Sequence, residues 1–294
     1  MRETLDKGLT KYAKTNKNLY LLIADLGKFT SFKNSFPEKH INLGIAESTM
    51  VGVAAGLAAE GKQVVIYAVA GFALNRLEQL KLDICLKNKN VKLINAGSGM
   101  VYNSVGSGHY LIDDIAILQT LPNMTIATPC DRKEFSQILK FSLKSKEPYY
   151  IRLGKDNCED LHQNTISIGN PVKLTSEESD TILLSYGVCT KECLGAYKIL
   201  KEQNIKVNAI HLPYLKPLIS LKELLKDKKV VVVEDHISFG GLGSILDKQG
   251  IKYHHLCLPD KVDKIFHDNK EIWEYYKLDE VSISNYVKDI FVKK

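Results

Sequence analysis

The segment NLGIAESTMVGVAAGLA at residues 42–58 combines a long run of small apolar residues with a single carboxylate, Glu47. The residues from Ser48 to Glu60 predict a helix whose small side chains allow very close packing against another element. Glu47 stands directly before this helix, where the helix dipole favours an acidic side chain. The alternative is a buried carboxylate with a functional role. Periodicity alone does not distinguish the two.

On both sides of this segment, short apolar runs bounded by Gly, Pro, Asn or Asp alternate with amphipathic stretches. In the first half of the chain we predict strands at 19–24, 63–68, 91–95, 124–127 and 149–153. Helices are predicted at 48–60, 74–87, 114–120 and 132–144. Alternating strands and helices are typical of βα units built around a parallel sheet, so the predicted fold class is α/β.

The chain becomes polar and loses its periodicity between Gly154 and Ser179, and Gly169-Asn170-Pro171 is a turn signal. A second α/β series follows, with strands predicted at 181–185, 207–211 and 229–234, helices at 190–202 and 220–226, and a short helix opened by the glycine-rich residues 240–243. We therefore predict two doubly wound domains with mostly parallel sheets, at 1–158 and 179–294, joined by a linker at 159–178.

The composition excludes several protein classes. With 45% hydrophobic and 25% charged residues, the 294-residue chain is typical of globular proteins. Its apolar runs, such as 64–72, are shorter than the roughly 18 residues of a membrane-spanning helix, and its amino end lacks a signal-peptide core. The net charge of +6 comes mostly from dispersed lysines, which does not favour nucleic-acid binding. We expect a cytoplasmic protein with reduced core cysteines and no metal site of its own.

Four motifs, taken in order, resemble the C-terminal half of the transketolase family. They are Gly44-Ile45-Ala46-Glu47 with the helix AAGLA at 54–58, YIRLG at 150–154, VEDH at 233–236 and GGLG at 240–243. The resemblance covers nearly the whole chain. It implies that the first domain is the pyrimidine-binding domain of a thiamine diphosphate enzyme and that the second is the transketolase C-terminal domain.

The resemblance also implies roles for individual residues near the cofactor. Glu47 matches the glutamate that hydrogen-bonds the aminopyrimidine ring and favours the tautomer that deprotonates the thiazolium. Phe72 matches the aromatic residue that stacks on the pyrimidine, and Asp25 matches an acid near the thiazolium. Val69 and Asn75 match further positions of the pyrimidine pocket that are often aromatic in the family.

Substrate-binding positions are matched less uniformly. His109, in a glycine-rich loop, matches the histidine that contacts the hydroxyl oxygens of the donor, and it is both a catalytic and a substrate-binding candidate. Arg2 and Lys155 match phosphate contacts, although Lys155 replaces the usual arginine. Val105 stands where transketolases carry an aspartate that binds a sugar hydroxyl, and Gly97 stands in place of a histidine.

The chain contains no Gly-Asp-Gly segment followed by an asparagine some thirty residues later, which holds the diphosphate and its metal in this family. The resemblance therefore implies a split enzyme, in which an N-terminal subunit supplies the diphosphate-binding domain and a divalent metal such as Mg²⁺. Two active sites would then form between chains in an α2β2 heterotetramer, with the 48–60 helix at a subunit interface.

The function implied is that of the C-terminal, or β, subunit of a transketolase, a transferase of carbohydrate metabolism. It would move a two-carbon ketol unit from a ketose to an aldose, and the departures at Gly97 and Val105 suggest a specialised sugar. The alternatives are the β subunit of a 2-oxo acid dehydrogenase, a deoxyxylulose-phosphate-synthase-like enzyme, or a non-catalytic regulatory subunit. His109 favours a ketose donor, and Glu47 and Phe72 argue against a non-catalytic role.

Overall fold

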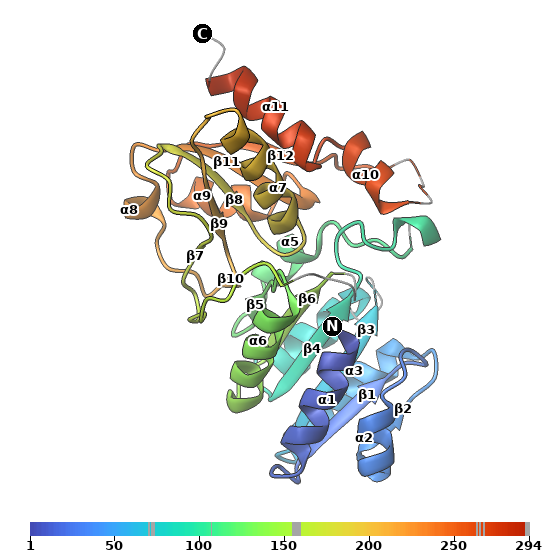
Figure 1. The fold of residues 1–294 in the computed structure, drawn as a ribbon. Coiled ribbons are helices and arrows are strands. Elements are labelled where there is room, and N and C mark those ends of the chain that lie inside the picture. Colours follow the sequence, from blue (N-terminus) through green and yellow to red (C-terminus); the bar gives the residue numbers. More distant parts are fainter. Residues whose placement is uncertain are drawn as a thin grey trace.

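The computed structural model describes residues 1–69, 71, 74–106, 108–154, 160–262, 264, 266 and 268–291. It contains a seven-stranded and a five-stranded sheet, one above the other in Figure 1. The larger sheet has the order β10-β5-β6-β4-β3-β1-β2. Its strands are β1 Leu19–Ile23, β2 His40–Asn42, β3 Gln63–Val69, β4 Val91–Ala96, β5 Thr125–Ala127, β6 Tyr149–Leu153 and β10 Tyr214–Lys216.

Side chains of the larger sheet alternate between two hydrophobic layers. Leu21 and Val65 pack with Leu5 of α1, Phe32 of α2 and Phe135 of α6 on one face. The neighbouring residues Leu22, Val64 and Ile66 pack with α3 and α5 on the other face. Because both faces are covered, the central strands are apolar along their whole length, as in doubly wound sheets. The helices are α1 Arg2–Ala13, α2 Thr30–Ser35, α3 Glu47–Ala59, α5 Asp114–Gln119 and α6 Arg132–Lys144.

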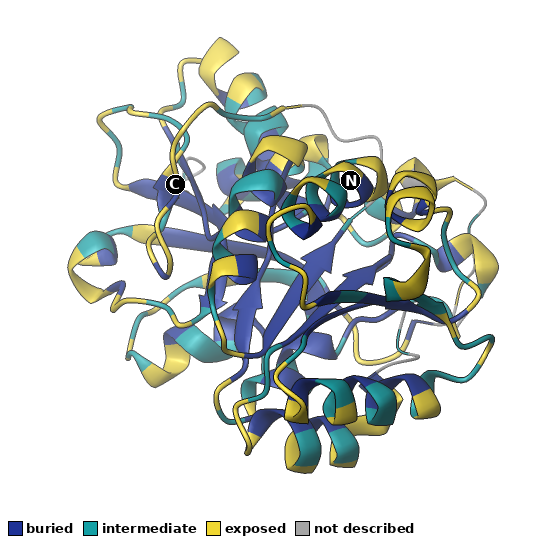
Figure 2. Ribbon diagram, turned by 90° about the horizontal axis from the view of Figure 1, so that it is seen from below, coloured by how far each residue is buried: buried dark blue, intermediate teal, exposed yellow. Residues whose placement is uncertain are grey.

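The smaller sheet has the order β12-β11-β8-β9-β7 and is also mostly parallel. Its strands are β7 Val172–Lys173, β8 Thr181–Ser185, β9 Asn208–His211, β11 Lys229–Ile237 and β12 His254–Leu258. The accompanying helices are α7 Cys189–Glu202, α8 Lys222–Leu225, α9 Leu242–Lys248, α10 Asn269–Tyr275 and α11 Glu280–Phe291. Figure 2 shows the strands as the buried centre and the helices as partly exposed layers. The predicted α/β class with mostly parallel sheets is confirmed.

The two sheets are interlocked. β10 lies in the second half of the chain, yet it pairs antiparallel with β5 at the edge of the first sheet. β7 lies within the predicted linker, yet it pairs antiparallel with β9 and extends the second sheet. One hydrophobic core continues from Leu118 and Ile126 of the first domain to Leu184 and Leu212 of the second. The domains are therefore packed as one body.

The predicted helix at 74–87 is wrong as a continuous α-helix. The chain forms a 3₁₀ turn at Leu74–Arg76, one α-helical turn at Leu77–Gln79 (α4) and a π-helical segment at Leu80–Cys85. A π turn inserts an extra residue and rotates the positions that follow it. As a result Leu82 and Leu86 are exposed while Ile84 and Cys85 are buried.

Helix α1 was not predicted, although Leu5, Leu9 and Ala13 have helical spacing and are buried. The buried Asp6 of this helix accepts hydrogen bonds from the backbone N–H groups of Ser31 and Phe32. These amides begin α2, whose own N-cap residue makes no side-chain bond. Asp6 therefore caps α2 from a neighbouring helix.

None of the helices among the described residues combines the length and apolar character needed to span a bilayer.

Candidate active site

Four neighbouring strands of the larger sheet end at one edge. β2, β1, β3 and β4 are parallel, and the register aligns Ile23 with Asn42 and with Tyr67, and Val69 with Ala96. In parallel sheets, ligands bind at the carboxyl ends of the strands. The segments that follow these four strands carry most of the residues predicted from the sequence.

A pocket of about 210 Å³ lies at this edge. It joins the first turn of α1, the loop after β1, the end of β3 and the loop after β4, and it is lined by Arg2, Leu26, Gly27, Tyr67, Val69, Tyr102, Val105 and His109. The lining therefore combines one arginine, one histidine and two tyrosines with two valines around a small space. Gly27, with a φ of +78°, is packed so closely that an added Cβ would lie 2.9 Å from Phe29.

A hydrogen-bonded network joins the end of β1 to the turn before α3. The side-chain oxygen of Asn42 accepts from the N–H groups of Asp25 and Gly44, at 2.9 and 3.0 Å. Asp25 has a φ of +55°, a conformation that aspartate adopts more readily than most residues. The network therefore fixes both Asp25 and the Gly44–Ala46 turn that leads into Glu47. Glu47 is the first residue of α3 and is half-buried.

Tyr102 occupies the space that a side chain at position 97 would need. A Cβ built on Gly97 would lie 2.0 Å from Cδ2 of Tyr102 and 2.2 Å from its Cε2. Gly97 also has a φ of +75°, which favours glycine. The tyrosine ring thus takes the place of a residue-97 side chain in the pocket wall.

Two family models match the chain: the transketolase pyrimidine-binding domain at residues 1–160 and the transketolase C-terminal domain at residues 171–265. The chain belongs to the transketolase family. It corresponds to the C-terminal half of a transketolase, the half that split transketolases carry as a separate polypeptide.

Individual relatives agree with this assignment. The chain is 30% identical to a subunit of the apulose-4-phosphate transketolase of Phocaeicola vulgatus, over 100% of this chain and 97% of the relative. It is 30% identical to a 6-deoxy-6-sulfo-D-fructose transketolase subunit of a Clostridium species, over 83% and 78%. It is also 29% identical to the 1-deoxy-D-xylulose-5-phosphate synthase of Halothermothrix orenii, but over only 38% of that enzyme. A solved structure described as a split-gene transketolase, an inactive β4 tetramer, superposes with a TM-score of 0.83 at 30% identity, covering 98% and 96% of the two chains.

Within this transketolase half, the structure brings together only some of the predicted residues. Arg2, Val69 and His109 line one pocket, and Leu26 and Gly27 of that pocket directly follow Asp25. Glu47 lies after the neighbouring strand β2 and is not among the residues that line the pocket. Asn75 is exposed in the 3₁₀ turn after β3. Phe72 and Lys155 lie outside the described residues.

Sequence reasoning missed Tyr67, Tyr102 and Asn42. Tyr67 and Tyr102 line the pocket, and Asn42 organises the Asp25 turn. The signal for Tyr67 was its place at the end of a strand, two residues before Val69, at the sheet edge where ligands generally bind. No local pattern indicated Tyr102, because its role depends on the missing side chain at Gly97.

A buried ion-pair network lies beneath the β4 loop. Arg152 at the end of β6 donates to Asp114 at 2.9 Å and to Asp235 of the second domain at 2.7 Å. Tyr150 also donates to Asp114, at 2.6 Å. Burial raises the pKa of Asp235 to about 6, although Arg152 opposes the shift. Arg152 therefore joins the two domains of the transketolase half through paired charges.

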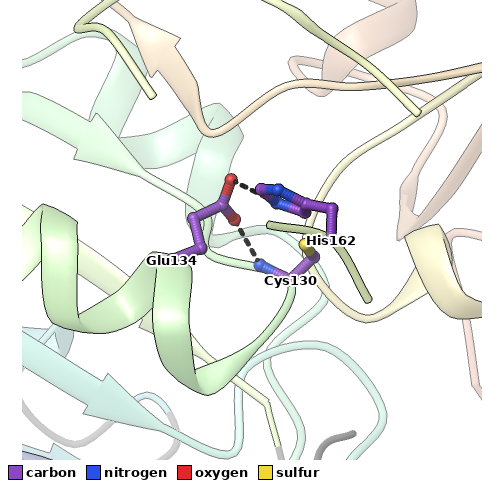
Figure 3. A group of neighbouring side chains, drawn as sticks. All are labelled: Cys130, Glu134 and His162. Atoms are coloured by element: carbon purple, nitrogen blue, oxygen red, sulfur yellow. Dashed lines mark hydrogen bonds and ion pairs between the residues drawn. The ribbon is translucent and has the colours of Figure 1, made fainter. Parts of the chain in front are cut away.

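Figure 3 shows a second polar cluster between the domains, formed by Cys130, Glu134 and His162. Their ligand-type atoms lie within 4.8 Å of one another. Glu134 accepts from the Cys130 N–H at 2.7 Å and pairs with His211 at 2.8 Å and with His162 at 3.3 Å. The Asn164 N–H donates to Nδ1 of His162. The hydrogen of a neutral His162 ring is therefore on Nε2, the atom that faces Glu134.

These contacts describe a hydrogen-bonded interdomain cluster. Burial alone would raise the pKa of Glu134, but the charge of His211 and the hydrogen bonds from both histidines hold it below its usual range. The hydrogen bond to Glu134 in turn raises the pKa of His162. His211 belongs to β9 and Glu134 to α6, so the carboxylate ties the two domains of the chain together.

Proposed function

We propose that this chain is the C-terminal, or β, subunit of a split transketolase whose active site is completed by a second polypeptide. That partner would carry the diphosphate-binding domain and a divalent metal such as Mg²⁺, and two active sites would form in an α2β2 assembly. Two relatives that are transketolase subunits by name, matched over most of their length, support the proposal. The pocket supports it as well, because 210 Å³ is below the roughly 300 to 1,000 Å³ of an ordinary ligand pocket.

The exposed apolar surface of the first domain supports a partner at the α3 face. Ile45, two residues before Glu47, is 85% exposed, and Leu77, Leu82 and Leu86 are also exposed. An added Cβ on Gly56 of α3 would meet no atom within 4 Å. Small and apolar residues that are exposed around a functional carboxylate are typical of a surface covered in an assembly.

The chain's own residues fit the pyrimidine end of thiamine diphosphate, the cofactor of this family. Glu47 is half-buried at the start of α3, beside the exposed Ile45, so its carboxylate can meet a ligand that a partner presses onto this edge. When bound, the cofactor supplies the nucleophilic carbon of the reaction. The chain contributes a carboxylate that holds a proton at the pyrimidine ring nitrogen and apolar side chains, Val69 and Phe72, that orient the ring. Asn75 and Asp25 would complete this end of the site.

Substrate binding is assigned to the pocket. His109 would hold or move a proton at a hydroxyl oxygen of the donor, and Arg2, with Lys155, would bind an anionic group of the sugar. The valine at 105 is 58% exposed and offers no hydrogen bond from its side chain, whereas Tyr102 offers a phenol. This wall favours a specialised sugar over an ordinary pentose phosphate, in keeping with the substrates that the names of two relatives carry.

The half-buried carboxylate at the start of α3 carries the proposal, so we would test it with Glu47→Gln in the chain mixed with a candidate diphosphate-domain protein. General acid–base groups contribute about 10²- to 10⁴-fold to rates, and we expect ketol transfer to fall by at least ~100-fold. Glu60→Gln, at the other end of the same helix, is the matched control and should keep full activity. A Glu47→Gln complex with normal turnover would leave the chain with a scaffold role only.

The sugar is identified by a screen of ketose donors and aldose acceptors with the same complex. We expect the highest kcat/KM for a pair other than the common pentose phosphates. If xylulose 5-phosphate and ribose 5-phosphate gave the best kcat/KM, the assignment of a specialised sugar would be wrong.

A further inference from the structure

We propose that the second domain positions the substrate loop of the first, and that Asn103 is the main residue through which it acts. The substrate loop is the chain between Gly99 and Leu111, which carries Tyr102, Val105 and His109 of the pocket. The loop's role toward substrate rests on the proposed function. Its attachment to the second domain rests on contacts in the structure alone.

Asn103 is fully buried and makes two reciprocal bonds to the second domain. Its Nδ2 donates to the carbonyl of Lys264 at 3.1 Å, and its Oδ1 accepts from the N–H of Phe266 at 2.8 Å. One side chain thus satisfies a donor and an acceptor of the same backbone segment, as a neighbouring strand would. An alanine at this position would leave both backbone groups without these partners.

Both ends of the substrate loop are also embedded in the second domain. Met100 and Ile112 belong to the hydrophobic cluster formed by Leu183, Val231 and the helices α7 and α11. The hydroxyl of Tyr110 donates to the carbonyl of Val262 at 3.0 Å. The N–H of Ile237 donates to the carbonyl of Ile112 at 2.9 Å. These contacts fix the residues on either side of His109.

The base of the loop is closed over the buried ion pairs. Gly99 and Leu111 exchange two backbone hydrogen bonds, at 2.7 and 2.9 Å. An added Cβ on Gly99 would lie 1.6 Å from Oδ2 of Asp235, so the carboxylate of the second domain lies directly against the loop base. Arg152 holds that carboxylate at 2.7 Å.

The consequence is that the second domain, none of whose described residues lines the pocket, determines how well the pocket is ordered. A long loop is otherwise among the most mobile parts of a protein. Holding it in the binding geometry before substrate arrives removes an ordering cost from binding, and a fractionally ordered site weakens apparent affinity in proportion. Asn103 is therefore a positioning residue, and it acts on substrate through Tyr102, Val105 and His109.

Hydrogen exchange on the full-length chain tests the attachment without any assumption about activity. In Asn103→Ala we expect the protection factors of the Gly99 and Leu111 amides to fall at least about tenfold. Protection factors elsewhere in the chain should stay unchanged. Asn208→Ala is the matched control, because Asn208 makes the same reciprocal bonds to the backbone of Glu177, far from the pocket. It should leave the substrate loop unaffected. Unchanged exchange in the Asn103 variant would overturn the proposal.

Tyr110→Phe covers the case in which Asn103→Ala does not fold, since it removes only one hydroxyl. Tyr110→Phe should lower the protection factors of the same loop amides by a smaller factor. In the reconstituted enzyme, we expect both variants to raise the KM of the donor sugar, by up to about tenfold for Asn103→Ala, with kcat within about twofold. A loss of kcat at unchanged KM would contradict positioning. Inactivity of the unsubstituted complex would instead count against the proposed function and leave the exchange result to stand alone.

Discussion

Position 97 illustrates how a residue behind the pocket wall determines which side chain forms that wall. The sequence alone indicated that Gly97 replaces a histidine in the transketolase pattern, but it could not indicate what fills the space. In the structure the ring of Tyr102 does so, and the glycine is required both by this contact and by its positive φ. Residues that act through such a contact are not predictable from spacing, because the partner lies on a loop whose path depends on the second domain.

We predict that Gly97→Ala destabilises the chain by about 2 to 5 kcal/mol. A left-handed conformation costs a non-glycine residue roughly 1 to 2 kcal/mol, and overpacking against Tyr102 adds about 1 to 3. Gly61→Ala separates the two effects, since Gly61 also has a φ of +75° but an added Cβ there meets no atom within 4 Å. Equal losses in urea unfolding of the two variants would rule out the Tyr102 contact as a cause.

Helix α3 and most strands of the two sheets were predictable because their sequence signals are local. The alternation of apolar runs predicted β1, β3 to β6, β8, β9 and β11 to within a few residues, and the small-residue run predicted α3. Strands β2 and β12 were not predicted. The short strands β7 and β10 carry no such signal, since each pairs antiparallel at a sheet edge that another part of the chain provides. The π-helical segment after Gln79 was likewise hidden, because one inserted residue breaks the helical period.

At the scale of the element, α3 yields a prediction about assembly. Gly56→Leu should leave the stability of the isolated chain unchanged or slightly raised, since glycine is about 1 kcal/mol less favourable than alanine inside a helix. The same side chain should weaken association with the diphosphate-domain protein at least about tenfold, as measured by sedimentation. Lys140→Leu, exposed on α6, provides the control for added surface hydrophobicity. Undiminished association of the Gly56 variant would place the interface elsewhere.

A second element-scale prediction concerns Glu234, a buried residue of β11 that lies against the start of α9. It accepts from the N–H groups of Leu242 and Gly243 and pairs with His255 of β12 at 2.7 Å. Burial lowers the pKa of His255, but hydrogen bonds to Cys257 and Glu234 outweigh it and raise the pKa to about 9.

Because the folded pKa of His255 exceeds its unfolded value of about 6.5, protonated His255 stabilises the fold fully below pH 6.5. That contribution is lost as the pH rises through about 9. The unfolding temperature should therefore fall between these values, and His255→Gln should flatten this part of the profile. His254→Gln, at the exposed neighbouring position, should retain the slope. A His255 variant with the original slope would assign the pH dependence to another group.

At the scale of the whole molecule, the sequence predicted two α/β domains but not how they are joined. Arg152 pairs with Asp235, Glu134 with His211, and Asn103 with the 264–266 backbone, and each pair links segments at least 77 residues apart. Such contacts leave no local pattern. The motif match nevertheless identified both domains of the transketolase half, because the order of the motifs reflects the family and not the packing.

The most direct test of the split-site account is a calorimetric titration of thiamine diphosphate with Mg²⁺. The titration is made into the isolated chain and then into the chain mixed with a candidate diphosphate-domain protein from the same organism. The account predicts binding in the mixture and none to the isolated chain, since the residues for the diphosphate and metal lie on the partner. Tight binding to the isolated chain would contradict it.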